Sequence, residues 1–190
     1  MTLKSEVRLA GFGGQGIILA GHILGKAGAL FEKKNAVFTQ SYGPEARGGS
    51  CSADVVISEE AIYYPKVEKP GVLVIMSQGA METYGSSIDS DGVLILDEDL
   101  VTLESEPQVR TVYRVPCTRI AEQMGKKIVA NIVMLGALAA LGGVVGYDSM
   151  REAVLSSIPP GSEDLNITAF DKGFEYGQNL LDRTGGKKIN

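Results

Sequence analysis

The residues most suited to chemistry form a glycine-rich run near the N-terminus, Gly11-Phe12-Gly13-Gly14-Gln15-Gly16. The run follows an apolar stretch at residues 7–11 and precedes apolar residues at helical spacing over residues 17–30, an order that predicts strand, tight turn and helix. Glycines at this spacing let a phosphate approach the backbone, where the first N–H groups of the helix face the anion. The candidate binding residues are Gly11, Gly13, Gly14, Gln15 and Gly16. The alternative is that the glycines serve only the turn.

A polar loop at residues 40–50 is the second candidate site, because it follows the carboxyl end of a predicted strand, where open α/β sheets bind ligands. Within it, Arg47 offers a planar fork of donors to a phosphate or carboxylate. The candidate residues of this loop are Gln40, Ser41, Tyr42, Glu45, Arg47, Gly48 and Gly49. We expect the loop and the glycine-rich run to lie near each other and form one anion-accepting surface. The alternative is a surface loop with solvated charges.

A self-sufficient dinucleotide enzyme would need an acidic residue at the end of the second strand to hold the adenosine ribose. The sequence has Thr39, Gln40 or Ser41 at that position, and Glu32 and Glu45 are poorly placed for the task. The pattern therefore disfavours a stand-alone oxidoreductase. That interpretation stays open as an alternative, together with a nucleotide-binding regulatory module.

The remaining titratable residues favour structural roles. His22 is the only histidine and has no neighbouring nucleophile, and Cys51 and Cys117 are expected to be small core residues. The acidic run at residues 97–99 predicts a solvated turn that caps the following segment rather than a metal site. No carboxylate pair, triad or metal-ligand spacing supports self-contained catalysis. We therefore assign no catalytic residue and no metal ligand.

Composition limits the class of protein. The chain has 190 residues, 44% hydrophobic and 22% charged, which suits one folded domain with a sizeable core. Its formal net charge of −5 opposes binding to nucleic acid through phosphates. The two cysteines provide neither a disulfide framework nor an iron–sulfur ligand set. The N-terminus lacks a signal-peptide pattern, and we expect a cytoplasmic protein.

The hydrophobic pattern predicts an α/β protein. Continuous apolar runs at residues 72–76 and 93–96 are typical of strands covered on both faces. Further strands are expected at residues 7–11, 35–39, 52–58 and 109–115. Helices are expected at residues 17–30, 77–84 (capped by Ser77), from 116 onward, 128–141, 148–156 and 166–181. The predicted architecture is a three-layer Rossmann-like fold, a mostly parallel sheet with helices on both faces. Residues 1–183 are expected to form a single domain and residues 184–190 a disordered tail.

An uncharged segment at residues 128–145 just reaches the length of a membrane span. It contains Asn131 and many small residues, so we interpret it as a helix buried between the sheet and another surface, which in so small a chain would be another subunit. This interpretation predicts a homodimer when the chain is isolated.

The motifs together resemble a known family. Residues 11–17, the loop at residues 40–49, Ala53-Asp54-Val55-Val56-Ile57 and residues 131–138 look like the gamma subunit of 2-oxoacid:ferredoxin oxidoreductases. The resemblance covers residues 7–141. The loop sequence Ser41-Tyr42-Gly43-Pro44-Glu45-Ala46-Arg47 is most similar to that of the 2-oxoglutarate type, with the branched-chain 2-oxoacid type next and the pyruvate type third.

The resemblance implies a complex that converts a 2-oxoacid, coenzyme A (CoA) and oxidised ferredoxin to acyl-CoA, carbon dioxide and reduced ferredoxin. Thiamine diphosphate and iron–sulfur clusters would reside in partner subunits, alpha and beta with a ferredoxin-like delta subunit as a further candidate. This chain would bind no cofactor tightly, would have a structural and CoA-handling role, and would be inactive alone.

Overall fold

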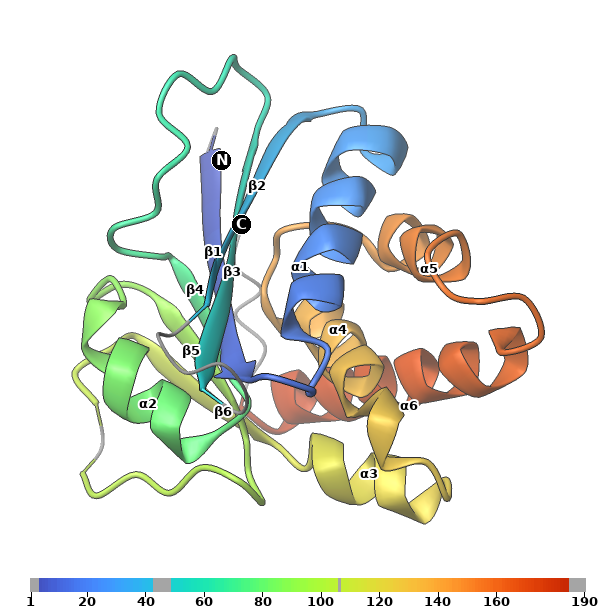
Figure 1. Ribbon diagram of the computed structural model, residues 1–190. Helices are drawn as coiled ribbons and strands as arrows, with labels where there is room; N and C mark the ends of the chain where they lie inside the picture. The colour runs from blue at the N-terminus through green and yellow to red at the C-terminus, as the bar shows by residue number, and fades with distance from the viewer. Residues whose placement is uncertain (1–3, 43–48, 106, 185–190) are drawn as a thin grey trace.

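The computed structural model describes residues 4–42, 49–105 and 107–184 (Figure 1). The strands are β1 (Lys4–Phe12), β2 (Asn35–Tyr42), β3 (Ser50–Ser58), β4 (Val72–Ile75), β5 (Val93–Asp97) and β6 (Thr111–Val115). The helices are α1 (Ile17–Lys26), α2 (Gln78–Tyr84), α3 (Cys117–Gln123), α4 (Ala130–Leu141), α5 (Tyr147–Leu155) and α6 (Glu163–Arg183). Single turns add the π-helix η1 (Ala27–Phe31) and the 3-10 helices η2 (Gly85–Ser87) and η3 (Lys127–Val129).

One sheet in the order β2-β3-β1-β4-β5-β6 forms the centre of the fold. Neighbouring strands β1, β4, β5 and β6 are parallel, while β3 runs antiparallel to both β1 and β2. The chain leaves β1 toward β2 on one side and returns to β4 on the other. The strand order therefore reverses between β1 and β4, which is the position where open α/β sheets bind ligands.

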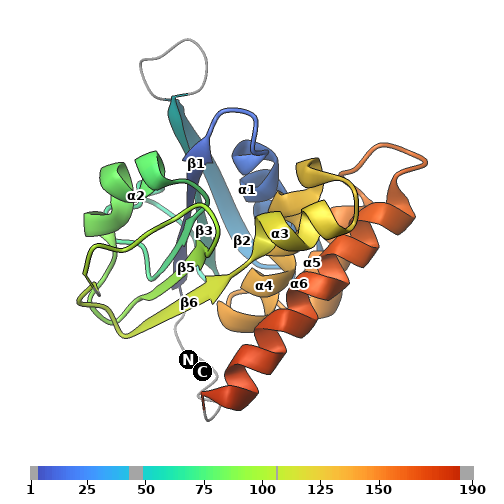
Figure 2. The same ribbon diagram turned by 90° about the horizontal axis from the view of Figure 1, so that it is seen from below.

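Helices cover both faces of the sheet, as the apolar runs predicted (Figures 1 and 2). Helices α1, α3, α4, α5 and α6 share the larger core with one face. The opposite face packs against α2 and the segments around it in a smaller core. Every residue of β4 and β5 is buried, which is why residues 72–75 and 93–96 are continuously apolar. The Rossmann-like architecture is confirmed, with unequal outer layers.

Helix α4 is buried by its own chain, in contrast to the expected cover by another subunit. All of its residues from Ala130 to Leu138 are buried, because α6 crosses it at backbone contact. A Cβ added at Gly173 would lie 1.9 Å from the Val133 carbonyl oxygen, and one at Gly136 would lie 2.0 Å from the Phe170 carbonyl oxygen. The apolar surface that suggested a homodimer is therefore internal. Within the described ranges, no helix is both long and apolar enough to cross a bilayer.

Element ends differ modestly from the sequence-based expectations. The predicted helix at residues 17–30 continues past Lys26 as the π-turn η1. Helix α6 starts at Glu163, three residues before the expected position, because Glu163 and Asp164 suit the positive end of a helix dipole. Ser77 caps α2 as predicted, its hydroxyl accepting from the Ala80 N–H at 3.2 Å. Thr184 closes α6, and residues 185–190 lie outside the described part.

The contact between α4 and α6 predicts the effect of Gly173→Ala. The added methyl group must push the two helices apart, so we expect a loss of about 1–3 kcal/mol or more in the free energy of unfolding, despite the better helix propensity of alanine. The measurement is urea unfolding. Gly25→Ala in α1 is the control, because its nearest neighbour would be Phe38 Cβ at 3.7 Å, an ordinary contact. Equal stability of the two variants would contradict the close crossing.

Candidate functional site at the carboxyl edge of the sheet

The glycine-rich run forms the turn between β1 and α1. Gly14 and Gly16 adopt positive φ values of 103° and 71°, which glycine reaches without steric cost. A Cβ at Gly16 would also lie 2.3 Å from Nδ2 of Asn131, whose amide donates a hydrogen bond to the Gly16 carbonyl at 3.2 Å. Gly16 is the N-cap of α1 and offers no side-chain acceptor. The first N–H groups of α1 therefore keep the orientation expected for binding an anion.

Gln15 fixes this turn across the point where the strand order reverses. Its Oε1 accepts from the Phe12 N–H at 2.9 Å, and its Nε2 donates to the Met76 carbonyl at 2.6 Å, just beyond β4. A Cβ at Gly11 would lie 2.4 Å from Oε1 of Gln15, so the first glycine makes room for this side chain. The Gln15 amide therefore links the glycine turn to the end of β4 by two hydrogen bonds.

The glycine turn and the second candidate loop touch. The Gly13 N–H donates to the Gly49 carbonyl at 3.1 Å, and Phe12 pairs with Ser50 at the start of β3. Gln40, Ser41 and Tyr42 end β2 on the far side of β3 and are exposed, Tyr42 by 64%. Residues Glu45, Arg47 and Gly48 lie outside the described residues. The structure thus brings the two loops together through Gly13 and Gly49.

A hollow of about 290 Å³ opens beside the glycine turn, between the ends of the parallel strands. It is lined by Phe12, Gly14, Gln15, Met76, Leu100, Thr118, Lys127, Ile128 and Ala130. A second hollow of about 350 Å³ shares Phe12 and Leu100 and adds Ser50, Ser77, Gln78 and Gly79. Ile128 is 78% exposed and Phe12 42% exposed, so the first hollow has an apolar rim. Lys127 supplies a cation there, paired with Glu122 at 3.3 Å.

Sequence reasoning missed Leu100, Thr118, Lys127 and Ile128. Leu100 follows β5, Thr118 lies in the first turn of α3, and Lys127 and Ile128 lie in η3 just before α4, so the four come from three separate segments. The signal that could have found them is the rule that ligands bind beyond the carboxyl ends of parallel strands, applied to β5 and β6 as well as to β1.

Asp97 departs from the expected solvated acidic turn, whereas Glu98 and Asp99 are exposed in that turn as expected. Its carboxylate is fully buried and accepts hydrogen bonds from the Thr118 N–H at 3.0 Å, the Thr118 hydroxyl at 2.7 Å and the Asp99 N–H at 3.1 Å. Burial raises the pKa of this carboxyl, while the hydrogen bonds from Thr118 and Asp99 lower it. Asp97 does hold the turn that follows it, through the Asp99 N–H, and the same carboxylate also accepts from the Thr118 N–H in the first turn of α3.

The other titratable residues have structural surroundings. Burial raises the pKa of Cys51 and raises that of Cys117 far more, so both thiols are unreactive core groups. His22 is exposed and lies edge-on to Phe38. Glu32 accepts from the Gly146 N–H at 2.8 Å, near the start of α5. Across residues 4–42, 49–105 and 107–184, no cluster of three or more metal-ligating side chains is present.

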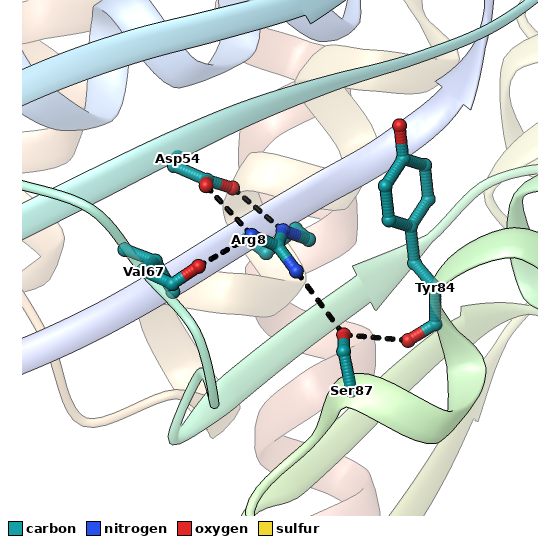
Figure 3. Close-up of polar contacts among 5 residues, drawn as sticks. All are labelled: Arg8, Asp54, Val67, Tyr84 and Ser87. Carbon is teal, nitrogen blue, oxygen red and sulfur yellow. Dashed lines mark hydrogen bonds and ion pairs between the residues drawn. The ribbon is translucent and has the colours of Figure 1, made fainter.

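Arg8 and Asp54 form an ion pair that sequence reasoning missed (Figure 3). Both guanidinium–carboxylate hydrogen bonds are short, at 2.7 and 2.8 Å, and Arg8 also donates to the Val67 carbonyl and the Ser87 hydroxyl. The guanidinium carbon lies 5.4 Å from the Tyr84 ring centre. The bond to Asp54 raises the pKa of Arg8. Through these contacts, the pair links β1 and β3 to the loop before β4 at Val67 and to η2, directly after α2, at Ser87.

The family follows from a match that spans most of the chain. The family model described as pyruvate ferredoxin/flavodoxin oxidoreductase matches residues 6–176. The chain belongs to this family. The 2-oxoglutarate synthase subunit KorC of Methanocaldococcus jannaschii is 54% identical over 182 residues, which cover 95% of this chain and 97% of that protein. The predicted resemblance is confirmed, and the chain is a subunit of an oxidoreductase complex.

Two further relatives show how the domain occurs elsewhere. The solved keto/oxoacid ferredoxin oxidoreductase gamma subunit from Geobacter sulfurreducens has a TM-score of 0.81 at 39% identity, covering 92% of this chain and 99% of that one. The ketoisovalerate oxidoreductase subunit VorA of Methanothermobacter thermautotrophicus is 35% identical over 93% of this chain but only 37% of its own length. In VorA, the matching region is therefore one part of a longer chain.

The buried carboxylate predicts a pH-dependent effect of Thr118→Val. The folded pKa of Asp97 lies above its unfolded value, so the cost of burying its charge is present above the folded pKa and disappears as the pH falls below it. The Thr118 hydroxyl reduces that cost. Its removal should lower the free energy of unfolding by about 1.5–3 kcal/mol at pH 8, with a smaller loss at acidic pH.

Urea unfolding at several pH values tests this. Thr168→Val is the matched control, because the exposed Thr168 hydroxyl donates only to a backbone carbonyl, that of Asp164. A loss for Thr118→Val that stays constant with pH would show that Asp97 does not ionise as argued.

Proposed function

We propose that this chain is the gamma subunit of a 2-oxoglutarate:ferredoxin oxidoreductase. The complex would convert 2-oxoglutarate, CoA and oxidised ferredoxin to succinyl-CoA, carbon dioxide and reduced ferredoxin. The observation that carries the proposal is the 54% identity, over nearly the whole of both chains, to a 2-oxoglutarate synthase subunit. The identity to the ketoisovalerate subunit is 35%, so the 2-oxoglutarate type is favoured, in agreement with the loop sequence.

The chain's own thiols do not fit an iron–sulfur cluster. Cys51 lies on β3 and Cys117 begins α3, and both are buried in the core, whereas a cluster needs several neighbouring thiolates. Electron transfer and thiamine diphosphate chemistry therefore belong to partner subunits in this proposal: alpha, beta and a ferredoxin-like delta subunit. We place the complex in the cytoplasm and treat residues 1–183 as one domain.

The role of this chain would be to shape the complex and to receive the phosphates of CoA. The glycine turn supplies backbone N–H groups at the start of α1, and the Gly13 N–H bonds to the carbonyl of Gly49, two residues after Arg47 in the sequence. The apolar rim at Phe12 and Ile128 suits the uncharged parts of such a ligand, with Lys127 as a second cation. The predicted residues in this role remain the glycines, Gln15 and the loop at residues 40–49.

The purified chain should have no 2-oxoacid oxidation activity by itself. Its residues supply neither an electron acceptor nor an electron path. The measurement is reduction of a dye acceptor with 2-oxoglutarate and CoA, for the single chain and for the chain mixed with its partner subunits. Turnover by the single chain would contradict the proposed division of labour.

Arg47→Ala should raise the apparent KM for CoA and leave that for 2-oxoglutarate nearly unchanged. A lost charge-assisted contact is worth about 1.5–3 kcal/mol, or roughly ten- to a hundred-fold in binding. Lys127→Ala tests the cation in the hollow beside the glycine turn in the same assay. Arg183→Ala at the end of α6 is the control for loss of a positive charge.

The same variants separate ligand binding from assembly. If Arg47 holds a neighbouring subunit, Arg47→Ala should weaken the complex in size-exclusion chromatography and depress turnover for every substrate together. An intact complex with both KM values unchanged would remove Arg47 from the site.

A further inference from the structure

Strand β2 has the features of a pairing edge. It lies at the end of the sheet and, within the described residues, pairs only with β3. Its eight residues, Asn-Ala-Val-Phe-Thr-Gln-Ser-Tyr, contain no charge and no proline, and the register with β3 is continuous without a bulge. Charged side chains, prolines and bulges are the features with which proteins usually protect an exposed edge strand, and β2 has none of them. The opposite edge strand, β6, is shorter and includes Arg114.

An apolar groove lies beside this edge, between residues of β2 and residues of α1 and η1. Its volume is about 320 Å³, and its lining is His22, Gly25, Lys26, Ala29, Leu30, Ala36 and Phe38. Leu30 is 61% exposed. The missing side chain of Gly25 leaves space above Phe38 Cβ, 3.7 Å from the position a Cβ would take. Alternate side chains of an added strand would face this groove.

We propose that β2 and its groove bind an extended strand from another subunit of the complex, with a carboxylate placed toward Lys26. This inference rests on the proposed function, because it takes the chain to work in a complex. Main-chain donors and acceptors along an edge are matched by an extended strand. In VorA, the matching region is covalently joined to the rest of a longer chain. A separate chain such as this one would need a non-covalent contact to stay beside the corresponding part of its complex.

Charge favours another subunit over a second copy of this chain. Lys26 is the charged residue among those lining the groove, and no carboxylate lines it. Its amine donates to the Ser156 carbonyl at 2.7 Å and the Ser157 hydroxyl at 3.2 Å, so it is held in place by two neutral acceptors. Strand β2 itself carries no acidic residue, so a two-fold pairing of β2 with a second copy would offer Lys26 no carboxylate partner. A strand of another subunit that carries an acidic residue would supply one.

Two neighbouring proline substitutions test the main-chain pairing. In an antiparallel strand, successive N–H groups point to opposite edges. Of Thr39→Pro and Gln40→Pro, one therefore removes a bond to β3 and lowers the melting temperature, while the other removes an outward N–H and leaves the fold intact. The stable variant should bind the remaining subunits, expressed without this chain, at least about ten-fold more weakly than the wild type in biolayer interferometry.

Leu30→Glu tests the groove in the same assay, with Thr168→Glu, at an exposed position of α6, as the matched control. We expect weaker binding for Leu30→Glu and unchanged binding for Thr168→Glu. Wild-type affinity for both the stable proline variant and Leu30→Glu would overturn the inference and leave the proposed function standing. Failure of the wild-type chain to bind the other subunits would overturn both. A dimer of the isolated chain that the stable proline variant dissociates would assign the edge to a second copy and overturn the proposal.

Discussion

The backbone contact between α4 and α6 is the constraint on which the candidate site depends. Gly136 and Gly173 let the two helices cross without intervening side chains, and this crossing presses α4 onto the sheet. At its amino end, α4 carries Asn131, which bonds to the carbonyl of Gly16, and Ala130, which lines the hollow. The geometry of the glycine turn is therefore set partly by core packing far from it. A loop supported in this way needs little ordering when a ligand binds.

The antiparallel strand β3 has two consequences for this chain. By inserting between β1 and β2, it places its first residues beside the end of β1, and this is why Gly49 reaches Gly13. The same insertion moves β2 to the outside of the sheet. Without this insertion, β2 would lie directly beside β1. The strand that completes the candidate site thus also creates the open edge.

Much of the fold could be predicted from the sequence because its signals are local. The apolar runs of β4 and β5, the glycines after β1 and the Ser77 cap each involve residues close together in the chain. The misses involve partners far apart. Asp97 has a polar sequence context, but its burial depends on Thr118, 21 residues away. The pairing of Arg8 with Asp54 depends on the β1–β3 register, which no periodicity reveals.

The candidate site shows the same division. The glycine turn was predictable because its residues are consecutive, and its contact with the second loop followed from strand order. The hollow was not, because its lining gathers side chains from the ends of β1 and β4, the loop after β5 and the start of α4. Its apolar rim also explains why polar motifs alone gave an incomplete picture. In the proposed role, backbone N–H groups and cations would face a charged end of the ligand and Phe12 and Ile128 an uncharged portion, which is why a molecule that carries both, such as CoA, is the ligand proposed for this edge of the sheet.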